Sequence, residues 1–211
     1  MKILITGGCG YVGTELVKSL IKKKINVRVI DLIWYKNSLS QYLGRYLNII
    51  QKDFRNIDKY DLQGVDCIIH LANVANDPSV ELDQNLSWEI NTLGMQILCE
   101  KCIKYNIKKF IYASSGSVYG VKRERNVTEN LTLEPISIYN KTKMTAERIL
   151  MSYSDSLIHY IIRPATVCGY SERMRLDLSV NILTFSALKN KVINVFGGSQ
   201  SRPNINIKDM V

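Results

Sequence analysis

The sequence has little of what builds metal sites, disulfide frameworks or membrane spans. Its 211 residues include only two histidines and four prolines. No apolar run approaches the roughly 20 residues of a transmembrane helix. The apolar run that follows Lys2 ends at Gly7, far short of the central segment of a secretion signal. We therefore expect a cytoplasmic protein with no membrane partner.

The five cysteines are an odd number without framework spacing, which favours a reducing compartment. Cys99 and Cys102 form a single CxxC pair inside a helical pattern. A structural zinc site would need two more ligands, and both histidines lie elsewhere in the sequence. We expect these cysteines to pack in the core and expect no metal site, with a redox or metal role as the alternative.

The net charge of +9 is the one feature that could indicate a nucleic-acid partner. The basic residues are scattered along the chain, however, and no basic face with interleaved aromatic residues is visible. We expect no nucleic-acid partner and assign most of this charge to solvated surface. An excess of positive charge would also attract an anionic substrate such as a nucleotide diphosphate.

Short β-branched runs alternate with longer amphipathic stretches. Runs such as Cys67–Leu71 are almost continuously apolar, which is typical of parallel strands covered on both faces. The alternation predicts an α/β fold with a Rossmann-type doubly wound parallel sheet. Helices are expected at Tyr11–Lys23, Leu86–Tyr105 and Tyr139–Tyr153. Strands are expected at Lys2–Thr6, Val27–Asp31, Leu47–Gln51, Cys67–Leu71, Lys109–Ser114, Leu157–Arg163 and Val192–Phe196.

A glycine-rich loop follows the first expected strand and opens the first expected helix. Gly7 allows the tight turn, Gly10 lets the backbone approach a pyrophosphate, and Gly13 lets helix and strand pack closely. Tyr11 and Val12 begin the helix, whose free N–H groups and positive dipole end attract phosphate. The loop therefore predicts a dinucleotide site.

Asp31 ends the second expected strand, where an acid hydrogen-bonds the ribose hydroxyls of a dinucleotide. Its charge would repel a 2′-phosphate, so NAD is favoured over NADP. The alternative is a simple strand-to-helix turn with a capping aspartate.

Lys143 lies four positions after Tyr139, so the two side chains are on one face of the third expected helix. A free phenol has a pKa near 10, but a neighbouring ammonium and a positive nicotinamide ring favour phenolate. We therefore expect a lowered pKa at Tyr139, which could accept a hydroxyl proton while hydride leaves the same carbon. A serine cluster in Ala113–Gly120 follows a strand at the sheet edge where ligands bind.

The chain resembles the extended short-chain dehydrogenase/reductase family of nucleotide-sugar epimerases and dehydratases. The resemblance implies Ser115, Tyr139 and Lys143 as the catalytic set, with Lys143 also holding the nicotinamide ribose. The motifs that carry it are TGGCGYVG at 6–13, Asp31, Asp53-Phe54, HLAN at 70–73, NTLG at 91–94, SSGSVYG at 114–120, YNKTK at 139–143 and Arg163-Pro164.

Further cofactor and substrate contacts also follow from the resemblance. Adenine would meet Asp53 and Phe54, Leu71 and Ala72 would flank the cofactor, and Pro164 would lie near the nicotinamide. The implied cofactor set is Gly7, Gly10, Tyr11, Val12, Gly13, Asp31, Asp53, Phe54, Leu71, Ala72, Asn91, Tyr139, Lys143 and Pro164. The substrate candidates are Ser115, Ser117, Arg173, Asn181 and Arg202.

Two segments narrow the subgroup. The 4,6-dehydratases of the family carry an Asp-Glu pair where this chain has Gly116 and Ser117, which argues against dehydration. The segment Ser171–Leu178 and the later Ser201–Pro203 resemble a branch with 4-epimerases and 4-dehydrogenases. In that branch, Arg202 would bind the diphosphate of the substrate, because a planar guanidinium can donate to two phosphate oxygens at once. Surface or packing roles remain open for Arg173 and Asn181.

The resemblance implies an NAD-dependent enzyme that oxidises C4 of a nucleotide-diphosphate sugar. Return of the hydride to the other face gives epimerisation, and the same residues would serve a 4-dehydrogenase or 4-ketoreductase. The alternatives are a 4,6-dehydratase and a non-catalytic dinucleotide-binding module. Relatives also imply a homodimer through the helices at Leu86–Tyr105 and Tyr139–Tyr153.

The regular alternation stops near residue 165. We expect residues 1–165 to form the NAD-binding Rossmann domain with the catalytic residues, and residues 166–211 to begin the substrate-binding region. Because relatives continue beyond the position of Val211, we expect that region to be partial.

Overall fold

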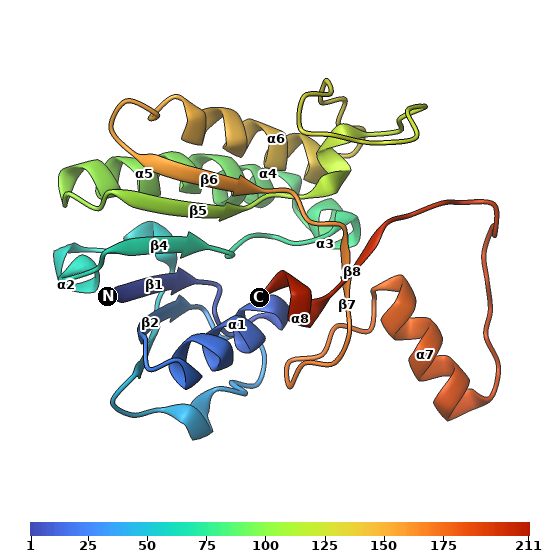
Figure 1. Ribbon diagram of the computed structural model, residues 1–211, viewed down its shortest axis with the longest axis horizontal. Coiled ribbons are helices and arrows are strands. Elements are labelled where there is room, and N and C mark those ends of the chain that lie inside the picture. The colour runs from blue at the N-terminus through green and yellow to red at the C-terminus, as the bar shows by residue number, and fades with distance from the viewer.

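The computed structural model describes residues 1–211 and contains a six-stranded parallel sheet. The strand order β3-β2-β1-β4-β5-β6 reverses direction between β1 and β4 (Figure 1), which confirms the predicted Rossmann-type doubly wound fold. The strands are β1 (Lys2–Thr6), β2 (Asn26–Asp31), β3 (Leu47–Gln51), β4 (Cys67–His70), β5 (Lys109–Ala113) and β6 (Ile158–Ile162).

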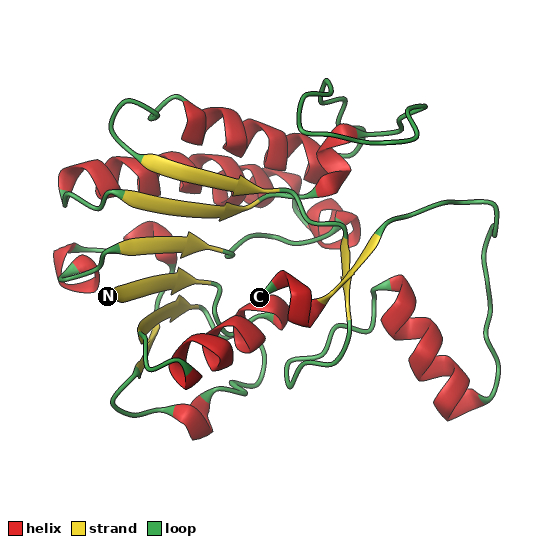
Figure 2. Cartoon of the chain, in the orientation of Figure 1, coloured by secondary structure: helices red, strands yellow, loops and turns green.

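Helices connect these strands and pack on the two faces of the sheet (Figure 2). The predicted helix at Leu86–Tyr105 is a composite, because a π-helical turn at Glu89–Leu93 separates two α-helical segments. The helices are α1 (Tyr11–Lys22), α2 (Lys59–Leu62), α3 (Asp77–Leu82), α4 (Gln84–Trp88), α5 (Gly94–Lys104), α6 (Ile138–Met151), α7 (Ser179–Asn190) and α8 (Ile207–Met210). None of them is long and apolar enough to cross a membrane.

The sheet separates two hydrophobic clusters. Successive side chains of a strand point to opposite faces, so Leu4 joins a cluster of 20 residues, whereas Ile3 and Ile5 join a cluster of 10. The larger cluster includes α5 and α6, with Leu98 and Leu150 fully buried. This double burial explains why the central strands read as continuous apolar runs.

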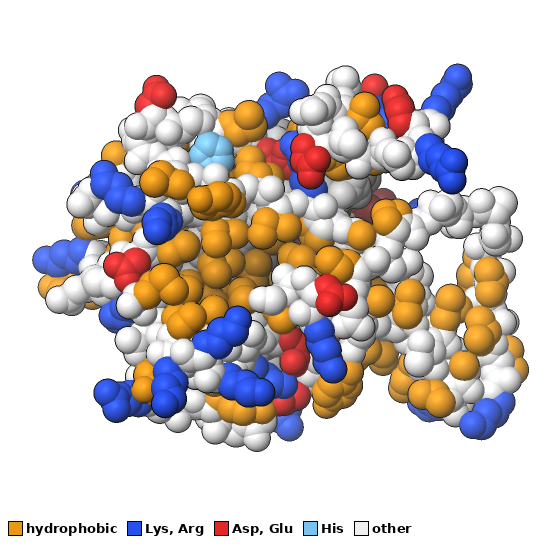
Figure 3. All heavy atoms as spheres, viewed as in Figure 1, with side chains coloured by type: hydrophobic (Ala, Val, Ile, Leu, Met, Phe, Trp, Pro, Cys, Tyr) orange, Lys and Arg blue, Asp and Glu red, His pale blue; other side chains and the backbone are white.

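The strand predicted at Val192–Phe196 is wrong. These residues lie in the connection between α7 and β8, and Phe196 is 90% exposed. Figure 3 shows apolar side chains along this projecting part of the chain. Valine, isoleucine and phenylalanine favour strands, but no neighbouring strand pairs with this segment.

A second, two-stranded sheet was not predicted. It pairs β7 (Thr166–Cys168) in parallel with β8 (Asn204–Asn206). The domain boundary expected at residue 165 falls just before β7 and remains a prediction.

Candidate active site

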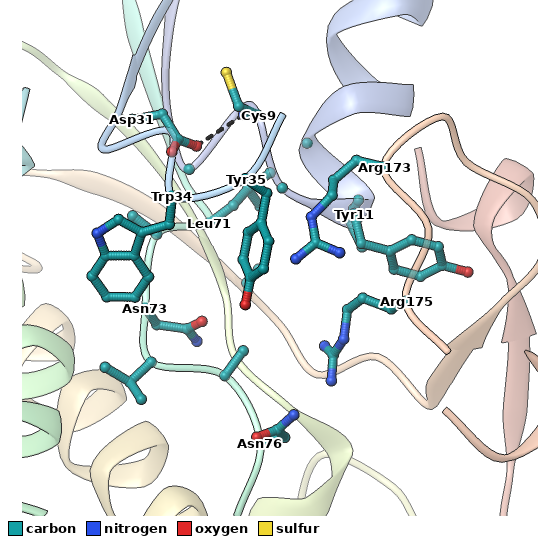
Figure 4. A pocket seen from close by; sticks show the side chains of 18 of the residues that line it. Cys9, Tyr11, Asp31, Trp34, Tyr35, Leu71, Asn73, Asn76, Arg173 and Arg175 are labelled. Atoms are coloured by element: carbon teal, nitrogen blue, oxygen red, sulfur yellow. Dashed lines mark hydrogen bonds between the residues drawn. The ribbon is translucent and has the colours of Figure 1, made fainter. Parts of the chain in front are cut away.

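A cavity of about 490 Å³ opens at the carboxyl ends of the central strands. This is where the strand order reverses, the usual ligand position in a doubly wound sheet. Figure 4 shows that its side chains come from the glycine loop, the loop after β2, the end of β4 and the segment after β7. The volume lies within the range of small-molecule sites.

The glycine loop has the geometry that an anion site requires. Gly7 has φ +74°, and a Cβ there would lie 2.6 Å from the Ala72 nitrogen. A Cβ on Gly13 would lie 2.5 Å from the Gly7 oxygen, so both positions require glycine. The backbone N–H groups of Tyr11, Val12 and Gly13 donate to no carbonyl, and no side chain caps α1. These N–H groups are free for a phosphate at the helix N-terminus.

Two backbone groups fix the carboxylate of Asp31 at the end of β2. Cys9 N donates to Oδ2 at 2.9 Å, and Ile33 N donates to Oδ1 at 2.8 Å. Asp31 lines the cavity beside the glycine loop. The carboxylate retains free lone pairs and can accept from ribose hydroxyls.

Asp53 and Phe54 line the cavity from the turn that follows β3. The Arg55 guanidinium holds the pKa of the Asp53 carboxyl below its usual value and donates to Oδ2 at 2.7 Å. Phe54 packs edge-on against the buried His70, with ring centroids 4.9 Å apart. The predicted cofactor residues Leu71, Ala72 and Pro164 line the same cavity.

Tyr139 and Lys143 both face this cavity from the first two turns of α6. Lys143 is 2% exposed, and its Nζ donates to the Ala113 carbonyl at 2.8 Å. The same nitrogen lies 5.9 Å from the centroid of the Tyr139 ring. Burial lowers the pKa of Lys143 to about 7, against an opposing effect of the Glu147 carboxylate.

The predicted lowering of the Tyr139 pKa counts on a bound nicotinamide as well as Lys143 and is not reached in the protein alone. Burial raises the pKa of this phenol to about 12, although the Arg175 charge and the Ser115 hydroxyl both act to lower it. The Lys143 ammonium on which the prediction relies is itself desolvated. Removal from water therefore dominates both side chains.

Of the clustered serines, one lines the cavity and two lie outside it, where one of them contacts α6. Ser114 lines the cavity and donates to the buried Glu147 carboxylate. Ser115 and Ser117 do not line it, but their hydroxyls lie 2.7 Å apart, and Ser117 donates to Asn140 at 2.6 Å. Ser115 is still close enough to Tyr139 to affect the pKa of its phenol.

Sequence reasoning missed the buried ion pair behind Lys143. Glu147 is 1% exposed, and its Oε2 lies 2.6 Å from Arg163 Nη2. Arg163 Nη1 also donates to the Tyr119 hydroxyl at 2.9 Å. A carboxylate four residues after Lys143, on the same helix face, was the available signal.

Two predicted ligand-binding residues instead support the protein. Asn91 is 1% exposed and outside the cavity lining; its amide exchanges hydrogen bonds with both backbone groups of Val74. Asn181 is 4% exposed and accepts from Gly169 N at 2.9 Å. The polar atoms of both amides serve other protein groups, which explains their burial.

The two arginines predicted to bind substrate lie in different surroundings. Arg173 lines the cavity, whereas Arg202 is exposed, outside the cavity lining, and bonded only through its carbonyl to Asn204. Sequence reasoning missed a polar cluster that lines the cavity, in which Arg175 pairs with Asp177 and Asn76 donates to the same carboxylate at 2.8 Å.

The cysteines and acidic residues form no metal site. No group of three or more histidine, cysteine, aspartate or glutamate side chains is placed to hold an ion. Cys99 and Cys102 pack in the larger hydrophobic cluster, and neither is part of a disulfide.

The cavity residues fit a dinucleotide. Unpaired N–H groups at the start of α1 suit a pyrophosphate, the fixed Asp31 carboxylate suits ribose hydroxyls, and the glycines leave room for a close approach. The Tyr139 phenol and the Lys143 amine are in the same cavity. One ligand can therefore reach from the glycine loop to the candidate acid–base group.

Comparisons with known proteins agree with this geometry. Residues 3–211 match the model of the NAD dependent epimerase/dehydratase family. A Bacillus subtilis protein named as an uncharacterized UDP-glucose epimerase is 36% identical over all of this chain and 70% of its own length. A Dictyostelium discoideum dTDP-D-glucose 4,6-dehydratase is 31% identical, over all of this chain and 54% of its own length.

A solved structure is similar throughout. UDP-glucuronic acid 4-epimerase from Bacillus cereus, in complex with UDP-glucuronic acid and NAD, has 30% identity and a TM-score of 0.88. The match covers all of this chain and 70% of that chain. The matched family model, the relatives and the fold together show that this chain belongs to the NAD dependent epimerase/dehydratase family and is an enzyme of that NAD-dependent class.

Proposed function

We propose that this protein oxidises C4 of a nucleotide-diphosphate sugar and then returns the hydride to the opposite face, which epimerises that carbon. The observation that best supports this proposal is that Tyr139 and Lys143 line the same cavity as the glycine loop and Asp31. A proton-transfer group and a dinucleotide cradle in one cavity suit coupled proton and hydride transfer. The similarity to UDP-glucuronic acid 4-epimerase and to a protein named as a UDP-glucose epimerase supports this substrate class.

Bound NAD would supply the hydride acceptor and, in the return step, the donor. The free N–H groups of α1 would bind its pyrophosphate, and Asp31 would accept from its adenosine ribose. By the family resemblance, Asp53 and Phe54 would contact adenine, Leu71 and Ala72 would flank the cofactor, and Pro164 would lie near the nicotinamide. The Asp31 carboxylate also discriminates against a 2′-phosphate, and so against NADP.

Tyr139 moves the proton at the phenolic oxygen. It takes the C4 hydroxyl proton during oxidation and gives it back during reduction, while Ser115 orients the hydroxyl. Lys143 holds the nicotinamide ribose and, when protonated, favours the phenolate. Burial raises the pKa of Tyr139 to about 12 in the protein alone, and the positive charge of bound NAD would favour the phenolate.

Two other reactions use the same residues. A 4-dehydrogenase or 4-ketoreductase would release or accept the 4-keto sugar instead of reducing it in place. The Dictyostelium relative makes a 4,6-dehydratase the second candidate. Gly116 and Ser117 bring no carboxylate to the serine cluster, however, so the elimination of water lacks its acid.

A homodimer is part of this proposal. Apolar side chains on the helices expected to pair are exposed, including Leu93, Ile103 and Met151. A dimer would bury such surface. Light scattering at micromolar concentration should give twice the mass of the chain.

The test of the function starts with the freshly purified protein. We expect nucleotide extraction to release NAD, and one member of a panel of UDP-, GDP-, dTDP- and CDP-sugars to raise the absorbance of reduced nicotinamide. Product analysis then separates a C4 epimer from a free or dehydrated keto sugar. Bound NAD that no sugar reduces would favour a non-catalytic dinucleotide-binding module, and the absence of any bindable dinucleotide would refute the proposal.

A further inference from the structure

Arg173 carries the one permanent positive charge in the cavity that no acidic side chain neutralises. The other cavity arginine, Arg175, forms an ion pair with Asp177, and Lys52 forms ion pairs with Asp58 and Asp61. Arg173 forms no ion pair, and its single side-chain hydrogen bond runs from Nη1 to the Met174 carbonyl at 2.7 Å. Its Nε is buried and has no hydrogen-bond partner.

A buried donor without a partner costs free energy, so its presence needs a reason. The guanidinium lies over the Tyr35 ring, with Cζ 3.8 Å from the ring centroid. Figure 4 shows the two side chains together inside the cavity. Tyr35 thus holds the guanidinium in place, and apart from the bond to Met174 none of its N–H groups has a partner in the protein.

The backbone near Arg173 is fixed to the glycine loop rather than to the catalytic side of the cavity. Ser171 Oγ donates to the carbonyl of Tyr11 at 3.0 Å, and Arg173 N donates to Ser171 Oγ at 3.3 Å. Tyr11 is the first residue of α1, whose N–H groups are free. The unneutralised arginine is therefore anchored beside the helix end that attracts phosphate.

The neighbouring Glu172 strengthens this anchor. Its carboxylate accepts from Lys18 Nζ at 2.8 Å, from the Tyr42 hydroxyl at 2.8 Å and from Gln41 Nε2 at 2.9 Å. These partners belong to α1 and to the connection between β2 and β3, the connection that also contains Tyr35. Arg173 and Tyr35 are thus presented by two segments that Glu172 joins.

We infer that Arg173 binds the pyrophosphate of the cofactor, opposite the N-terminus of α1, and that Tyr35 positions its guanidinium. This inference rests on the proposed cofactor site and replaces the substrate role expected for Arg173. Two N–H groups of a guanidinium match two oxygens of a phosphate, which an ammonium cannot reproduce. Arg175 differs, because it is already paired with Asp177 and its charge acts on the Tyr139 phenol.

The test compares cofactor fragments on Arg173→Met after removal of bound nucleotide. Isothermal titration should give an ADP dissociation constant roughly ten- to hundredfold higher than in the wild type, since hydrogen bonds to charged groups are lost. Adenosine, which lacks phosphate, should bind both proteins equally. The matched control Arg123→Met removes the same charge from an exposed position outside the cavity and should leave both affinities unchanged.

Two further variants separate charge from geometry. Arg173→Lys keeps the charge but not the planar donor pair, so its ADP affinity should fall between those of the wild type and the methionine variant. Tyr35→Leu should weaken ADP binding about two- to fivefold, as expected for loss of an exposed cation–π contact. Thermal unfolding of each apo variant checks that the fold is retained, and Arg173→Lys still decides the question if the methionine variant does not fold.

Unchanged ADP affinity in Arg173→Met would overturn the inference, as would equal losses for ADP and adenosine. Weakened UDP binding with normal ADP binding would also overturn it, because Arg173 would then belong to the substrate site. These results leave the proposed function standing, because NAD binding and sugar oxidation by the wild type are measured separately. A wild-type protein that binds neither NAD nor ADP would refute both.

Discussion

Asn181 donates from Nδ2 to the phenolic oxygen of Tyr11 at 3.2 Å, across 170 residues of sequence. The Tyr11 hydroxyl in turn donates to the Gly169 carbonyl at 2.7 Å. In Figure 4 the Tyr11 side chain points away from the centre of the cavity, toward the segment that follows β7. A residue of the glycine motif therefore anchors the chain that carries Arg173 and Arg175, and its backbone alone remains for the cofactor.

Asn181→Ala should loosen this anchor without unfolding the protein. The Gly169 N–H loses its acceptor, Asn181 Oδ1, so its amide hydrogen should exchange faster while amides of the central strands stay protected. Loss of these buried hydrogen bonds should lower the free energy of unfolding by about 1–3 kcal/mol. Hydrogen exchange with mass spectrometry measures the first effect and urea denaturation the second. Asn190→Ala, at the exposed end of α7, is the matched control, and equal protection of residues 169–177 in both variants would contradict the anchoring role.

Glu147→Gln should destabilise the protein strongly. Arg163 would keep its charge in a mostly buried position, with its side chain 18% exposed, after losing the carboxylate that pairs with it. Removing one partner of a buried ion pair costs about 3–5 kcal/mol. Urea denaturation at neutral pH measures this loss, and Glu129→Gln, an exposed residue without a side-chain partner, provides the control. A loss below about 1 kcal/mol would show that the pair contributes little net stability.

The sheet and the cofactor half of the site could be predicted because their signals are local. Gly7 follows β1 directly, Gly13 lies in the first turn of α1 and Asp31 ends β2. The i, i+4 spacing places Tyr139 and Lys143 on one face of α6. The expected positions of the six main strands agree with the structure to within about one residue, because buried parallel strands have continuous apolar runs.

The rest depends on contacts between distant segments. The hydrogen-bond partners of Asn181 lie 170, 12 and 6 residues away in the sequence, and no sequence pattern around Asn181 distinguishes this amide from a substrate ligand. The spacing of Tyr139 and Lys143 shows the neighbouring charge but not the shared burial that removes both groups from water in the protein alone. Val192–Phe196 has strand propensity without a strand to pair with, and tertiary context decides such segments.

The cysteines should react unequally with a thiol reagent. Burial raises the pKa of Cys9 and of Cys99 to about 12, so little thiolate forms at neutral pH. Cys168 is the one cysteine that is not fully buried. Mass spectrometry after brief treatment of the native protein should locate the first adduct at Cys168. Rapid modification of Cys99 or Cys102, or protection of that pair by added zinc, would instead support the redox or metal alternative.

The burial of Lys143 should make stability depend on pH. Its pKa is about 7 in the folded protein and near 10.5 in the unfolded chain, so the unfolded state binds more protons between these values. The free energy of unfolding should therefore rise with pH in this window, by at most about 1.4 kcal/mol per pH unit from this group.

Comparison with Lys143→Met isolates the contribution of Lys143, because the other titrating groups are common to both proteins. Urea denaturation at several values between pH 7 and 8.5 should show the wild type gaining on the variant as pH rises, and a constant difference would mean that Lys143 stays charged when buried.

Tyr139→Phe should abolish hydride transfer while leaving the cofactor in place. The substitution removes the phenolic oxygen and its proton but keeps the ring beside Lys143. Loss of a positioned acid–base group lowers rates by roughly 10²- to 10⁴-fold, and rapid-mixing absorbance of reduced nicotinamide, started with the active sugar, measures the step directly. NAD affinity should remain within about twofold because Asp31 and the free N–H groups of α1 are unchanged.

The control, Tyr60→Phe, removes a hydroxyl from an exposed tyrosine outside the cavity and should behave as the wild type. If Tyr139→Phe reduced NAD at the wild-type rate, the proton would have to leave through another group, and the Ser115 hydroxyl, which already acts on the same phenol, would be the next position to change.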